Sequence, residues 1–177
     1  MKESYVEKIR INKYLSMSGI CSRRDADKLI EQGVVTINGR IATPGDKVSE
    51  ADTVLVGGKQ AQNKEKKVVL AFYKPKGVVC TERDKHAEKK IMDMISYPVR
   101  VTYAGRLDKD SEGAIIFSND GEFINQLAHP RYGVQKTYIV HTAGKIAPAD
   151  FQRITSGIMD DGELLKACSV REVGRNC

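Results

Sequence analysis

The chain opens with apolar residues at helical spacing. Ile11, Tyr14 and Leu15 share one face of a helix expected over residues 10–17, and Gly19 can end it. The pattern therefore predicts a short amphipathic helix.

A second helix is predicted to begin at Ser22. Ser22 and Asp25 stand at the spacing of a capping box, in which the serine accepts a backbone N–H and the acid reaches back. Ala26 and Ile30 then supply a buried stripe, and Gly33 closes the helix.

A small antiparallel sheet is expected next. The β-rich run 34–37 leads into Asn38-Gly39, the strongest short-range hairpin signal. Residues 40–42 follow as the return strand, and residues 46–56 supply a further strand or two.

The rest of the chain mixes short strands and helices around a turn-rich stretch at residues 105–113. A buried strand is expected over residues 68–73, further strands over 99–103, 114–117, 137–142 and 166–173, and helices around 89–95, 122–128 and 148–156. Strands and helices at such irregular intervals predict an α+β fold with a mixed or antiparallel sheet.

A polar stretch separates the two patterns. Residues 60–67 have almost no apolar content, which is typical of a linker. We expect an N-terminal domain over residues 1–60, a linker over 61–67 and a larger domain over 68–177. The alternative is a long surface loop within one domain.

Composition limits the classes of function. The chain has 177 residues, 41% of them apolar, a formal charge of +6 and a pI near 9.1. Residues 1–67 hold 13 Lys and Arg against 9 Asp and Glu, which favours a polyanionic partner for this part. With no secretory signal and no apolar run long enough for a bilayer, we expect a cytoplasmic protein without a membrane partner.

The four cysteines are too scattered for a metal site: Cys21, Cys80, Cys168 and Cys177.

Basic residues gather on the polar faces of the two predicted helices and on the hairpin. The set is Arg10, Lys13, Arg23, Arg24, Lys28 and Arg40. Cations on a rigid helix can follow RNA phosphates, and a helix N-terminus adds free N–H groups. Charge alone leaves a merely solvated helix face equally open.

Residues 10–39 closely resemble the S4 RNA-binding module, which takes its name from a ribosomal protein. The likeness includes the Ser-Arg-Arg turn at residue 22, the Leu-Ile-x-x-Gly helix end and the Asn38-Gly39 hairpin. The resemblance implies that the six basic residues bind RNA.

A carboxylate-rich loop is the main candidate for chemistry in the larger segment. Asp108, Asp110 and Glu112 alternate as in a calcium loop, but the twelfth position is Asn119 rather than glutamate. No metal site is therefore expected. Turn-capping aspartates, with Arg106 as a structural ion-pair partner, are the other interpretation.

Residues 103–121 resemble the signature loop of the ribosomal RNA pseudouridine synthases. Residues 74–81 and 129–140 resemble the motifs on either side, in the same order. The resemblance implies isomerisation of uridine to pseudouridine in ribosomal RNA, and is greatest to enzymes of large-subunit RNA, with small-subunit enzymes next. Transfer RNA stays open as a further substrate, the reaction needs no cofactor, and the oligomeric state is open.

The resemblance also assigns residue roles. Asp108 matches the catalytic aspartate, which either attacks C1′ or takes a proton from C2′. Arg106 matches the arginine that contacts the flipped-out nucleotide. Tyr138 matches the tyrosine that packs against the target uracil; its alternating surroundings alone favour a sheet-core tyrosine.

The family's catalytic domain normally continues well beyond residue 177. We therefore expect a catalytic domain that is incomplete at its C-terminus. The alternative function is that of a catalytically inactive RNA-binding protein or ribosome-assembly factor.

Overall fold

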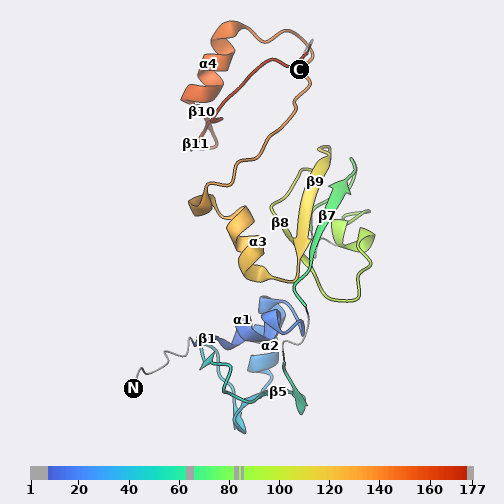
Figure 1. The fold of residues 1–177 in the computed structure, drawn as a ribbon, viewed down its shortest axis with the longest axis vertical. Helices are drawn as coiled ribbons and strands as arrows, with labels where there is room; N and C mark the ends of the chain where they lie inside the picture. The colour runs from blue at the N-terminus through green and yellow to red at the C-terminus, as the bar shows by residue number, and fades with distance from the viewer. Residues whose placement is uncertain (1–7, 63–65, 82–83, 85, 175–177) are drawn as a thin grey trace. The chain divides into compact units, whose positions relative to one another are not determined.

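The structure is a computed structural model that describes residues 8–62, 66–81, 84 and 86–174. The middle of the predicted linker and Cys177 lie outside these ranges. The chain divides into two units, residues 1–134 and 135–177 (Figure 1).

The first unit begins with the two predicted helices, α1 (Ile11–Met17) and α2 (Arg23–Glu31). The Ser22 hydroxyl oxygen accepts the Asp25 N–H at 3.2 Å and donates to the Asp25 carboxylate at 2.6 Å. The predicted cap at Ser22 is therefore confirmed.

The hairpin and its sheet follow as predicted. β2 (Val35–Ile37) and β3 (Arg40–Ile41) pair antiparallel across Asn38 and Gly39, whose φ angles are 50° and 83°. Both lie in the left-handed region that this tight turn requires. Together with β5 (Val54–Val56) and β6 (Lys59–Gln60) they form a sheet in the order β3-β2-β5-β6, while β1 (Ile9–Arg10) pairs with β4 (Lys47–Val48).

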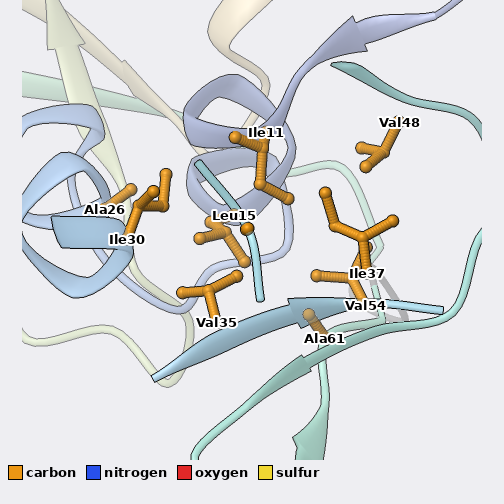
Figure 2. Packing of buried hydrophobic residues seen from close by; sticks show 10 residues of the cluster. Ile11, Leu15, Ala26, Ile30, Val35, Ile37, Val48, Val54 and Ala61 are labelled. Carbon is orange, nitrogen blue, oxygen red and sulfur yellow. The ribbon is translucent and has the colours of Figure 1, made fainter. Parts of the chain in front are cut away.

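One hydrophobic core joins the helices to this sheet (Figure 2). Leu15 of α1, Ile30 of α2 and Val35 of β2 are at most 2% exposed. Ala61 is also buried, at 1% exposure, although we expected a linker to begin there. The domain limits at residues 60 and 68 stay a prediction.

The second part of this unit is an antiparallel sheet of β7 (Val69–Lys74), β9 (Gly113–Ser118) and β8 (Thr102–Ala104), in that order. The helix α3 (Gly121–Ala128) packs against β8 and β9.

A separate core lies beneath this sheet, centred on Phe117, whose ring makes edge-on contacts with Phe72 and Tyr103. The short helix η1 (Ile91–Met94) adds Ile91 to it.

The prediction that the first strand of this sheet is buried is wrong. Val69 and Tyr73 of β7 are 56% and 64% exposed. β7 is an edge strand, and only the face that carries Leu70 and Phe72 packs on the core.

Side chains after β9 hold the chain that enters β7. The Asn119 amide accepts the Val68 N–H at 2.8 Å and donates to the Lys66 carbonyl at 2.9 Å. Lys67 and Asp120 form an ion pair at 2.7 Å, and Asp120 also caps the N-terminus of α3. These contacts fix where β7 begins.

The second unit contains the predicted helix α4 (Pro148–Ser156) and a hairpin of β10 (Ile158–Asp160) and β11 (Glu163–Leu165). The strands expected over residues 137–142 and 166–173 are wrong: neither segment is a strand. A strand exists only where a neighbour completes its hydrogen-bond ladder, and no described residue does so for either segment.

Candidate functional site

The loop over residues 105–112 carries the predicted catalytic aspartate and joins β8 to β9. It leaves the sheet beside the C-terminal end of β7, since Lys74 pairs with Gly113 in the antiparallel register. Asp108 and Arg106 are exposed on this loop. The carboxylate therefore faces solvent.

The ammonium group of Lys74 holds the loop from below. Lys74 is 0% exposed, and its Nζ donates to the Asp108 carbonyl at 2.9 Å and to the Ser111 carbonyl at 2.6 Å. Longer contacts reach the carbonyls of Pro75 at 3.2 Å and Lys109 at 3.4 Å. Carbonyl oxygens that converge on one buried cation fix the course of the backbone through residues 108–111.

Sequence reasoning missed this role of Lys74. A lysine at the end of an apolar strand, followed by proline, was the signal that could have indicated a buried cation. Three of the four acceptors come from a loop 34 to 37 positions away, so the pattern alone does not identify them.

Further contacts fix both sides of the loop. The Gly77 N–H donates to the Lys109 carbonyl at 2.7 Å, and the Leu107 N–H donates to the Cys80 sulfur at 3.4 Å. Gly113 ends the loop with a φ of 147°, and a Cβ there would lie 3.6 Å from the Leu107 side chain. The backbone that presents Asp108 is thus held on both flanks.

The three carboxylates of the loop differ in their surroundings. Glu112 lies near the Tyr73 hydroxyl: desolvation and then the charge of Glu112 raise the pKa of Tyr73. Among the described residues, Asp108 and Asp110 have no side-chain partner. The carbonyls bound by Lys74 include that of residue 108 but not that of residue 110. Both aspartates therefore carry free carboxylates on the backbone that Lys74 fixes, and of the two Asp108 alone also provides an acceptor carbonyl.

The structural ion pair considered between Arg106 and Asp108 does not form. Both side chains point into solvent, and neither pairs with any residue that the structure describes. The guanidinium and the carboxylate remain available to a ligand on the same loop.

Tyr138 lies in the second unit, on the extended segment that replaces the predicted strand. It is 61% exposed, and Ile139 and Val140 are 72% and 62% exposed. The interpretation of Tyr138 as a sheet-core tyrosine is therefore wrong. Its assignment to the uracil stays a prediction.

Five of the six basic residues of the first domain lie on the elements predicted for them, but Arg10 belongs to β1, immediately before α1, and not to the first helix. Five are exposed: Arg10, Arg23, Arg24, Lys28 and Arg40. Arg23 reaches Asn12 of α1 at 3.5 Å, and Arg40 forms an ion pair at 2.9 Å with Asp46, whose carbonyl accepts the N–H of Ile11. These contacts bring α2 and the hairpin up to α1.

Lys13 differs from the other five. Its ammonium forms an ion pair at 2.9 Å with Glu122 of α3 and is only 34% exposed. Lys28 is held more loosely, 3.6 Å from Asp25. Lys13 would have to leave Glu122 to contact a phosphate.

No group of three or more potential metal ligands occurs among the residues with described positions. No helix in the described ranges is long and apolar enough to cross a bilayer.

Known proteins share both parts of the chain. The sequence model of RNA pseudouridylate synthase matches residues 68–176, and that of the S4 domain matches residues 9–54. The dual-specificity RNA pseudouridine synthase RluF of Escherichia coli K12 is 39% identical over 166 residues, covering 93% of this chain and 57% of the relative. Ribosomal large subunit pseudouridine synthase B of Bacillus subtilis is 38% identical over 146 residues, covering 81% of this chain and 59% of the relative.

A solved structure has the same architecture. A crystal structure of a pseudouridylate synthase superposes with a TM-score of 0.61 at 25% identity, over 95% of this chain and 74% of the other. The chain spans less than two thirds of the length of the two relatives named above.

Proposed function

The chain belongs to the RNA pseudouridylate synthase family, and we propose that it converts a uridine of large-subunit ribosomal RNA into pseudouridine. The observation that carries the proposal is the exposed Asp108 carboxylate on a loop whose backbone a buried lysine fixes. Similarity to a large-subunit enzyme of Bacillus subtilis supports the choice of RNA.

The reaction is an isomerisation. The bond between N1 of uracil and C1′ of ribose breaks, the base turns, and a bond forms between C5 and C1′. The hydrogen at C5 leaves as a proton and N1 gains one, so atoms and electrons balance without an oxidant or a group donor. Asp108 would either add to C1′ or remove the C2′ proton, and an aspartate without an internal partner suits both steps.

The target nucleotide has to leave its stack before a carboxylate can reach its sugar. Flipping costs on the order of a few kcal/mol, which contacts to the extruded nucleotide must offset. We assign this role to Arg106, because a planar guanidinium can stack on a base or bind a phosphate. Tyr138 is proposed to pack against the uracil during its rotation.

The S4 domain would supply most of the affinity for RNA. Its cations are Arg10, Lys13, Arg23, Arg24, Lys28 and Arg40. Binding through phosphates releases counterions, so affinity should fall steeply as salt rises. Ribosomal RNA as the substrate would place the reaction in the cytoplasm, and transfer RNA is the second substrate to test.

The experiment maps pseudouridine in unmodified ribosomal and transfer RNA after incubation with the chain. We expect one modified uridine in large-subunit RNA, lost in Asp108→Asn but kept in the matched variant Asp110→Asn. RNA affinity should be the same in all three proteins. Full turnover by Asp108→Asn would overturn the assignment. RNA binding without any pseudouridine would leave only an RNA-binding or ribosome-assembly function.

A further inference from the structure

A rigid turn follows α3 and displays aromatic and cationic groups together. His129 caps the short helix η2 (Pro130–Tyr132): its Nδ1 accepts the Arg131 N–H at 3.2 Å. The Gly133 N–H returns to the Pro130 carbonyl at 3.0 Å, and Gly133 ends the turn with a φ of 62°. Proline and the closed hydrogen bonds limit the freedom of this backbone.

The side chains of Arg131 and Tyr132 form a stacked pair on the turn. The guanidinium carbon lies 4.5 Å from the centre of the Tyr132 ring, and the guanidinium donates to the tyrosine hydroxyl at 2.5 Å. The pair is exposed, with Tyr132 at 43%. By contrast, the rings of Phe72 and Tyr103 each contact the ring of Phe117 in the core.

The turn follows α3, which packs against β8 and β9, the two strands that the Asp108 loop joins. The chain reverses between β9 and α3, and α3 packs along β8 and β9 (Figure 1). The C-terminal end of α3 therefore points back toward the end at which β9 begins, where the Asp108 loop enters. An RNA whose uridine reaches Asp108 would have neighbouring nucleotides near this end.

We propose that Arg131 and Tyr132 form a stacking site for an unpaired nucleobase of the RNA substrate. An oriented tyrosine and a guanidinium plane are the groups that proteins use to stack bases of single-stranded RNA. The turn follows the C-terminal end of α3, where the helix dipole is negative and disfavours a phosphate, so a base suits the position better. The inference rests on the proposed function, because it takes the ligand to be RNA.

The test compares binding of two labelled oligonucleotides of equal length, an oligoadenylate and an abasic RNA, by fluorescence anisotropy. Loss of one base stack weakens binding by about 5- to 150-fold, so Tyr132→Ala should lower oligoadenylate affinity by that factor. Tyr132→Phe should retain the affinity, since the ring remains. Neither variant should change affinity for the abasic RNA. The salt dependence of Tyr132→Ala binding should equal that of the unchanged protein, because no phosphate contact is lost.

The proposal is overturned if Tyr132→Ala binds oligoadenylate normally, if Tyr132→Phe loses as much affinity as Tyr132→Ala, or if abasic RNA is affected equally. Thermal unfolding of each variant establishes that binding is measured on folded protein. Pseudouridine formation is measured separately. If the chain forms no pseudouridine while Tyr132→Ala still loses oligoadenylate affinity, the proposed reaction fails and the stacking site stands.

Discussion

Replacing Lys74 by methionine removes the cation beneath the Asp108 loop and little else. Methionine is also unbranched and nearly as long, so it can follow the same path through the core. The carbonyls of Asp108 and Ser111, 2.9 and 2.6 Å from Nζ, would then face a thioether.

Two opposing terms set the magnitude. A hydrogen bond to a charged group contributes about 1.5–3 kcal/mol, and two short ones are lost. Burying the ammonium costs several kcal/mol, and the variant avoids this cost. The buried carbonyls would remain without a hydrogen-bond donor. We therefore expect the lost hydrogen bonds to outweigh the avoided cost of burying the ammonium, and the variant to be destabilised by about 2–4 kcal/mol.

The assay is urea unfolding of the whole chain, with hydrogen exchange of the amides of residues 107–111. Lys76→Met is the matched control, since Lys76 is exposed two positions further on and should tolerate the same change. We expect a lower urea midpoint and faster exchange in the loop for Lys74→Met alone. An unchanged midpoint with unchanged exchange would refute the view that Lys74 holds the loop.

Three further predictions concern the two cores and the connection between them. Phe117→Ala should cost about 3–5 kcal/mol, because a fully buried ring leaves a cavity; urea unfolding measures this, and a loss below about 1 kcal/mol would contradict the packing described. Ser22→Ala should cost about 1 kcal/mol, because α2 loses its cap; circular dichroism during thermal unfolding checks it, and an unshifted transition would count against the cap. The hydrogen bond from Lys67 is the largest cause of the lowered pKa of Asp120. The ionised Asp120 carboxylate therefore stabilises the folded protein above about pH 4, and this stabilisation is lost as the pH falls through the lowered pKa. Asp120→Asn should therefore flatten the decline of stability in acid, and an unchanged pH profile would contradict the linkage.

Local signals in the sequence were sufficient for the first domain. A capping serine, two amphipathic stripes and Asn38-Gly39 each specify their own geometry within a few residues, and the structure has all of them. The loop between β8 and β9 was also predictable, since its turn residues lie between two strand-like runs.

Features that depend on distant partners were not predictable. Residues 137–142 have strand character but no described neighbour to pair with, so their apolar side chains are exposed. Asp161-Gly162 is a turn signal and forms the hairpin of β10 and β11, but the strand expected over residues 166–173 begins only after β11 has ended at Leu165. The carbonyl acceptors around Lys74 become visible only when β7 and the loop are adjacent.

The isomerisation must expel the hydrogen at C5 of uridine, so tritium release from RNA labelled at that position measures directly whether Asp108 carries out the reaction. We expect release by the chain from large-subunit RNA, at a rate that Asp110→Asn retains and Asp108→Asn abolishes. Release by Asp108→Asn at the unchanged rate would show that Asp108 is not the catalytic aspartate.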